Sequence, residues 1–134
     1  MWIEHVVNPK TITSIYSAEP PSLEQVQLFD ISIICGGDLQ CKLRFDLKEF
    51  PTDAPIKWIQ RECNTVQLAL NLIQTEIIQC TIPAGKGIGN LSIIYDENRF
   101  QISFNIQPQG IVFQATATWI HVDSISGYQQ DKSV

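Results

Sequence analysis

The chain has 134 residues, of which 44% are hydrophobic and 17% are charged, and its formal net charge is -5. This length and composition predict one folded domain over residues 1–134 and exclude a chain that is disordered as a whole. The nine Lys and Arg residues are scattered, so nucleic acid and anionic membrane are poor partners. An acidic surface serves either solubility or the binding of a basic protein.

The N-terminal stretch carries Glu4 and His5 and has no long apolar run, so we expect no secretory signal. No stretch reaches the ~18 apolar residues of a membrane span. These features predict a cytoplasmic protein. The four cysteines, at positions 35, 41, 63 and 80, form no CxxC pair, and we expect free thiols that act as small core residues.

A short helix is predicted near the N-terminus. Asn8 is placed as its N-cap and Pro9 as its first residue, where the missing N–H is not needed. Ile12, Ile15 and Tyr16 then recur at helical spacing, before the run SAEPPS ends the pattern.

From residue 26 the hydrophobic period changes to two, which is typical of strands with one wet face. A GGD turn at 36–38 joins two such stretches into a predicted hairpin over 26–35 and 39–47. Its apolar positions are Phe29, Ile31, Ile33 and Cys35, followed by Leu39, Cys41, Leu43, Phe45 and Leu47.

Five more strands are expected at 66–72, 78–82, 91–95, 100–106 and 111–122. They are joined by the run QTE, a flexible loop at 83–90, a DENR turn at 96–99 and a type I turn at 107–110. The fold is therefore predicted to be mainly β, close to the border with the α+β class. We expect an antiparallel sandwich or a strongly curled sheet of about seven strands, covered by one short N-terminal helix and ending in a frayed tail at 129–134.

Catalytic and metal chemistry find little support in the residues. His121 and Asp123 share a face of the last predicted strand, whereas the adjacent Ser124 points to the opposite face, which argues against a Ser-His-Asp site. Cys63 has no basic neighbour that would lower its thiol pKa. Two distant histidines and four separated cysteines make no metal-ligand spacing, and GKGIG lacks the pattern of a phosphate loop. We therefore predict no catalytic residue, no metal and no cofactor.

The run EFPTDAPIKW at 49–58 interrupts the alternation with two prolines and a tryptophan. Residues before proline favour extended backbone, so 49–56 is predicted to be a stiff, non-helical crossover. Its stiffness fixes the position of Trp58. The segment is expected to cross between sheets and close an open end with Phe50 and Trp58, and a direct binding role is compatible with that.

The run LRFDLKEFPTDAPIKW followed by NTVQLAL, together with a tryptophan at position 2, a helix holding IY and the run PSLEQVQL, resembles the immunity protein 50 family of bacterial polymorphic toxin systems. The resemblance extends from Trp2 to about Tyr128. The stretch IQCTIPAG departs from the family pattern, because it lacks the glycine and tryptophan expected there. The motif positions are Trp2, Phe50, Pro51, Pro55, Lys57, Trp58 and Asn64.

The resemblance implies a small, non-catalytic protein that binds a cognate toxin domain and neutralises it by occlusion. An acidic inhibitor would be steered to a basic toxin and could cover its cationic cleft. The chain is expected to be a monomer or a weak homodimer, since edge strands of an open sheet can pair between copies.

Two other functions stay open. One is a small-ligand or carbohydrate binding β module in which Trp58 or Trp119 lines a pocket. The other is an enzyme that uses His121 or a cysteine, which would need a concave pocket with convergent polar groups.

Overall fold

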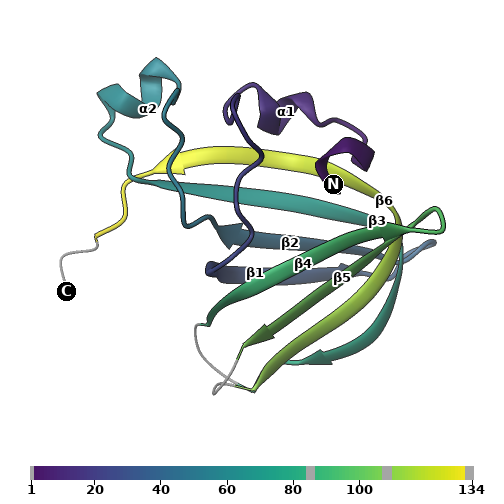
Figure 1. Cartoon of the computed structure of the whole chain (residues 1–134). Coiled ribbons are helices and arrows are strands. Elements are labelled where there is room, and N and C mark those ends of the chain that lie inside the picture. Colours follow the sequence, from purple (N-terminus) through teal and green to yellow (C-terminus); the bar gives the residue numbers. More distant parts are fainter. Residues whose placement is uncertain (1, 84–86, 107–109, 132–134) are drawn as a thin grey trace.

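The computed structural model describes residues 2–83, 87–106 and 110–131. In this part of the chain, six antiparallel strands close into a barrel in the order β1-β2-β3-β6-β5-β4 (Figure 1). The prediction of a mainly antiparallel β fold is confirmed, and the curled sheet closes on itself. The strands are β1 Val26–Ile34, β2 Gln40–Asp46, β3 Thr65–Thr81, β4 Ile88–Asp96, β5 Arg99–Ile106 and β6 Ile111–Tyr128.

The two strands predicted at 66–72 and 78–82 are one continuous strand, β3, which lowers the strand count from seven to six. The run QTE is not a turn between strands. Pairing with β6 passes from Ile73 opposite Trp119 to Thr75 opposite Ala117, and Gln74 between them has a φ of 53°. The strand therefore bends at Gln74 and continues, as it must where a sheet curls into a barrel.

The core is the inside of the barrel, and it follows the alternation in β2, β3, β5 and β6. Leu43 is buried as predicted, and Leu68 and Phe104 are buried as well, because each points inward from its strand. Full burial of a Leu, Ile or Phe side chain contributes about 1.5–3 kcal/mol, so this set dominates the stability. The largest fully buried side chains include Phe45, Leu68, Leu70, Leu72, Phe100, Ile102, Ile106, Phe113 and Ile120.

Strand β1 departs from the predicted facing. Its register with β2 shifts between Leu28 and Asp30, so Phe29 is an extra residue that turns outward. The ring of Phe29 is 60% exposed and lies 4.9 Å from the guanidinium of Arg44. Ile33 and Cys35, predicted to share its face, are exposed as well.

The barrel closes through a short seam. β1 and β4 pair only at Val26 opposite Gly89 and Gln27 opposite Ile88. The rest of the β4 edge lies beside the N-terminal segment, where the amide of Leu91 donates to the carbonyl of Leu23 at 2.9 Å. This segment therefore covers the edge of β4 beyond the seam.

The N-terminal segment holds a 3-10 helix, η1 (Trp2–His5), and α1 (Lys10–Thr13). The short helix is confirmed, but it ends at Thr13, before the predicted Ile15 and Tyr16, and its N-cap is Pro9 rather than Asn8. No side chain caps α1. Instead, the Asn8 amide bridges to strand β6: Nδ2 donates to the carbonyl of Val122 at 2.9 Å, and Oδ1 accepts from its N–H at 2.7 Å. Asn8 thus fixes the segment to the barrel.

A third helix, α2 (Ile56–Gln60), follows β2, and α1 and α2 lie at the same end of the molecule (Figure 1). Within the described residues no helix is long and apolar enough to cross a membrane.

The predicted turns and tail have mixed outcomes. The turn at 96–99 is confirmed, with positive φ at Glu97 and Asn98 as in a type I′ turn. The predicted loop at 83–90 is shorter, because β4 begins at Ile88, and positions 84–86 of it lie outside the described residues. The predicted turn at 107–110 falls there too, apart from Gly110, as do residues 132–134 of the tail.

Candidate recognition site

The candidate site is the segment between β2 and β3, residues 47–64. Pro55 has an extended backbone, with φ -54° and ψ 144°, and α2 begins at the next residue. The predicted non-helical stretch therefore ends at Pro55 rather than at residue 56. The segment also joins two neighbouring strands of one barrel and does not cross between sheets.

Trp58 anchors α2 to the barrel. Its indole lies over Gly127 of β6, so close that a Cβ added there would be 2.6 Å from Cδ2 of the indole. The ring of Phe50 lies 6.2 Å from it, tilted by 52°, and both side chains pack against the core. The amide of Cys63 donates to the carbonyl of Trp58 at 2.8 Å and turns the chain back toward β3.

Asn64 ties the end of the segment to the C-terminal end of β6. Its amide N–H donates to the carbonyl of Tyr128 at 3.0 Å. Its side chain donates to the carbonyl of Gln130 and accepts from the Gln130 amide, both at 2.8 Å. Within the tail predicted to fray, Gln130 is therefore held in place.

Asp46, the last residue of β2, is also tied to this end of β6. The phenol of Tyr128 donates to its carboxylate. Burial and this hydrogen bond raise the pKa of Tyr128, so the phenol is protonated at neutral pH.

Two residues that follow α1 form hydrogen bonds to the first part of the segment. The hydroxyl of Tyr16 donates to the carbonyl of Glu49 at 2.7 Å, and burial together with Glu49 raises the pKa of that phenol. The hydroxyl of Ser17 donates to Asp53 at 2.9 Å. Between them lies a hollow of about 240 Å³, which we call the acidic hollow; its lining includes Glu19, Glu49 and Phe50.

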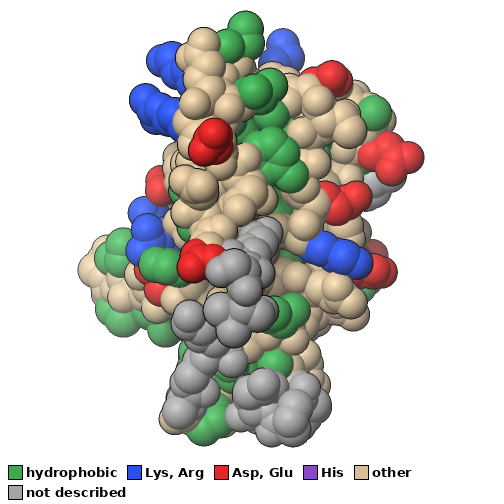
Figure 2. All heavy atoms as spheres, turned by 90° about the vertical axis from the view of Figure 1, so that its left-hand side faces the viewer, with side chains coloured by type: hydrophobic (Ala, Val, Ile, Leu, Met, Phe, Trp, Pro, Cys, Tyr) green, Lys and Arg blue, Asp and Glu red, His purple; other side chains and the backbone are tan. Residues whose placement is uncertain are grey.

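The outer surface of α2 is apolar and exposed. Ile56 is 72% exposed and Ile59 is 62% exposed, and α2 has no fully buried residue. Lys57 and Arg61 are exposed beside them. We call Ile56, Lys57, Ile59 and Arg61 the α2 crest. Figure 2 shows this side of the molecule, with hydrophobic, basic and acidic side chains together on its surface.

The structure brings together most of the predicted motif positions. Phe50, Pro51, Pro55, Trp58 and Asn64 all lie in this segment, and Pro51 is buried. Lys57 lies on the crest. Trp2 is not part of this group, because it is buried in η1 and borders a hollow with residues 18–24 and β4.

The two crest isoleucines were not predicted as site residues. Their signal was present, since Ile56 and Ile59 are three residues apart and directly follow a proline, as on one face of a helical turn. A helix of five residues has fewer than two turns, so its apolar positions repeat too few times to be recognised as a helical pattern.

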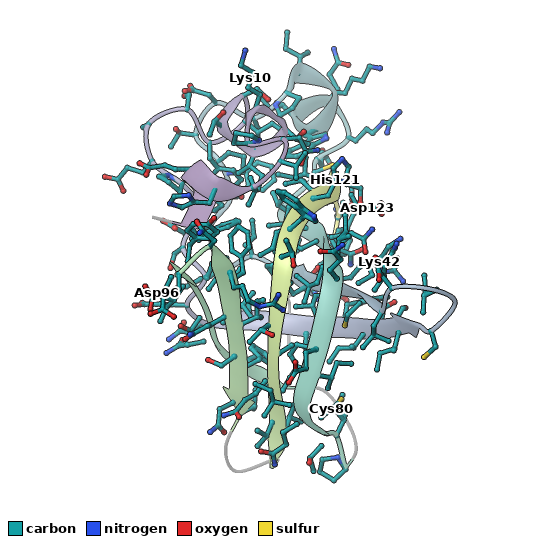
Figure 3. All side chains as sticks on the ribbon, turned by 90° about the vertical axis from the view of Figure 1, so that its right-hand side faces the viewer. Lys10, Lys42, Cys80, Asp96, His121 and Asp123 are labelled. Atoms are coloured by element: carbon teal, nitrogen blue, oxygen red, sulfur yellow. The ribbon has the colours of Figure 1, made fainter. Side chains whose placement is uncertain are left out.

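The residues considered for catalysis do not assemble. His121 and Asp123 both lie on β6 (Figure 3), but Asp123 forms an ion pair of 3.0 Å with Lys42 of β2. Among the described residues, no group of three His, Cys, Asp or Glu side chains could hold a metal ion. Trp119 lies on β6 with its side chain half exposed.

The four cysteines are free thiols, but the prediction that all are core residues was wrong. Cys41 is buried, and this burial, with a smaller effect of nearby Cys80, raises its pKa to about 12. Cys63 is half-buried. Cys35 and Cys80 are exposed, because one follows β1 at the hairpin turn and the other lies at the end of β3.

Residues 8–128 match the family model of immunity protein 50. The chain belongs to the immunity protein 50 family. The predicted resemblance is thus confirmed, and the match includes the whole candidate site, residues 47–64. Comparison of the chain with curated proteins and with solved structures finds no match.

Proposed function

We propose that this immunity protein binds a cognate toxin domain and neutralises it by covering its functional surface, without catalysis or a cofactor. The observation that carries the proposal is the α2 crest. It is an exposed surface of two isoleucines flanked by two basic residues, in a member of an immunity family, built on the segment that holds most of the family-motif positions.

The crest has the properties of a binding hot spot. Two large aliphatic side chains stand exposed and make no large contribution to the core, so their burial is available to a partner at about 25 cal/mol per Å². The backbone under them is already fixed by Trp58 on Gly127 and by Asn64 on Gln130. A pre-ordered surface loses little entropy on binding.

The charges of this protein indicate which kind of toxin surface it would bind. The net charge of -5 favours long-range attraction of a basic domain. In the acidic hollow, which the beginning of the same segment helps to line, Glu19 and Glu49 offer carboxylates to basic side chains of the toxin. Lys57 and Arg61 of the crest match acidic side chains on the same partner surface. Added salt is therefore expected to slow association more than it speeds dissociation.

The direct test is a titration of the toxin domain encoded beside this protein with the purified chain, followed by calorimetry and by the activity of the toxin. We expect a saturable complex and loss of toxin activity at the same molar ratio. Absence of a saturable complex at micromolar concentrations would overturn the proposal.

The surface is tested by Ile56→Ser and Ile59→Ser, with Ile94→Ser as the control, because Ile94 of β4 is also an exposed isoleucine, at 54%. Each crest variant should weaken binding by about tenfold or more, and the control by less than about twofold. All three should retain the thermal stability of the parent, since none of the three side chains is buried. Equal losses in the crest variants and the control would place the contact elsewhere.

One observation favours the second candidate, a carbohydrate-binding module, and it is the half-exposed indole of Trp119 on β6. Titration with a panel of oligosaccharides, read by tryptophan fluorescence, decides this function. A saturable shift that is lost in Trp119→Ala would support it, and no shift would remove it.

A further inference from the structure

Strand β1 has an open edge. One side of β1 pairs with β2 along its length, whereas the other side pairs with β4 only at Val26 and Gln27. From Phe29 to Ile34 no strand of the described chain lies against this second side. The corresponding edge of β4 is covered, since Leu91 and Asn90 bond to residues 23 and 25.

Beyond the bulge at Phe29, this edge lacks the features that protect edge strands. Natural edges carry lysines, prolines or inward-pointing charges that block pairing with another chain. Here Phe29, Ile33 and Ile34 are 60%, 45% and 55% exposed, and the stretch has no lysine or proline. Its one charge, Asp30, forms an ion pair with Arg44 of the neighbouring strand.

We infer that Phe29–Ile34 is the pairing edge for a second copy of this chain, which adds antiparallel to β1 about a twofold axis at Ser32. An antiparallel pair of identical strands has Ser32 opposite itself, Ile31 opposite Ile33 and Asp30 opposite Ile34. The two carboxylates therefore never face each other, and the isoleucines meet across the axis.

The distribution of charge favours this edge over other surfaces for self-association. Two copies that each carry a net charge of -5 repel each other. Residues 26–37 contain Asp30 as their only charged residue, and its charge is balanced by Arg44. Repulsion is therefore weakest where the two β1 edges would meet.

The geometry leaves room for a second copy. The β1–β2 hairpin extends to one side of the barrel, away from the helices at the top of the view (Figure 3). The α2 crest thus stays accessible in the dimer, so dimerisation and toxin binding can be tested separately.

The test is sedimentation velocity of the full chain from about 1 to 200 µM in low and high salt. We expect a monomer–dimer equilibrium that shifts toward dimer at high salt, because salt screens the repulsion between acidic copies. Ile33→Lys should abolish the dimer, and Ile94→Lys, the same change at an exposed isoleucine of β4, should leave it unchanged. Circular dichroism confirms that both variants fold.

The register is tested by Ser32→Cys in a chain that also carries Cys35→Ser and Cys80→Ser. Air oxidation should give a disulfide-linked dimer, since the introduced thiol faces its own copy across the axis. In this process two thiols lose two protons and two electrons to molecular oxygen, which is reduced, and one S–S bond forms.

Three results would overturn the inference. One is a monomer at every concentration and both salts. The second is a dimer that survives Ile33→Lys. The third is a monomer whose toxin binding is weakened by Ile33→Lys, which would assign the edge to a strand of the toxin instead.

Discussion

At the scale of single residues, the close contact of Gly127 with the indole of Trp58 limits which side chain position 127 can carry. An added methyl group would lie 2.6 Å from Cδ2 and 2.9 Å from Cγ of the indole, so Gly127→Ala must displace the ring and α2 with it. We expect the free energy of unfolding to fall by about 1–3 kcal/mol, as overpacking does in other cores. Urea denaturation measures the change.

Trp58→Ala provides the matched background for this substitution. Without the indole the added methyl group has nothing to displace, so Gly127→Ala should then change stability by about 0.5 kcal/mol or less. An equal loss in both backgrounds would show that residue 127 is constrained by something other than Trp58.

At the scale of elements, Asn8 connects the N-terminal segment to β6. Asn8→Ala removes both hydrogen bonds to Val122, whose side chain is buried, and leaves its N–H and carbonyl without these partners. We expect a loss of about 1–3 kcal/mol in the free energy of unfolding. Limited proteolysis should also cut earlier within residues 2–16, because the anchor of η1 and α1 is gone.

Thr13→Ala is the control for Asn8→Ala, because Thr13 belongs to α1 but its side chain is exposed. It should leave both stability and the proteolysis pattern close to those of the parent. If the two variants behave alike, helix propensity rather than the bridge to β6 determines how firmly the segment is held.

The elements also show what the sequence can predict. Alternation identified the inward faces of β2, β5 and the first half of β3, because the direction of a side chain depends on its own strand. The outward turn of Phe29 and the bend at Gln74 were missed, since each depends on the partner strand and on the closure of the barrel. In the site, the prolines indicated a stiff segment, but the contact of Trp58 with Gly127 joins positions far apart in the chain.

At the scale of the whole molecule, the strands of the barrel pair to very different extents. β3 and β6 pair over a long stretch, whereas β1 and β4 form only a short seam. β3 and β6 pair from Thr65 opposite Tyr128 to Thr81 opposite Val112, and their inward residues are buried over residues 66–72 and 111–122. β1 and β4 meet over two residues. Opening the seam breaks few hydrogen bonds and exposes little of the core, so local opening there should need far less free energy than global unfolding.

Native-state hydrogen exchange tests this difference. Amides at the centre of β3 and β6, such as those of Leu70 and Ile120, should exchange only through global unfolding, with a strong dependence on urea. The amide of Leu28, which donates to Gly87 at the seam, should exchange through local opening with little dependence on urea. If Leu28 exchanged as slowly as Leu70, the barrel would open as one cooperative unit, and the seam would not be its weak point.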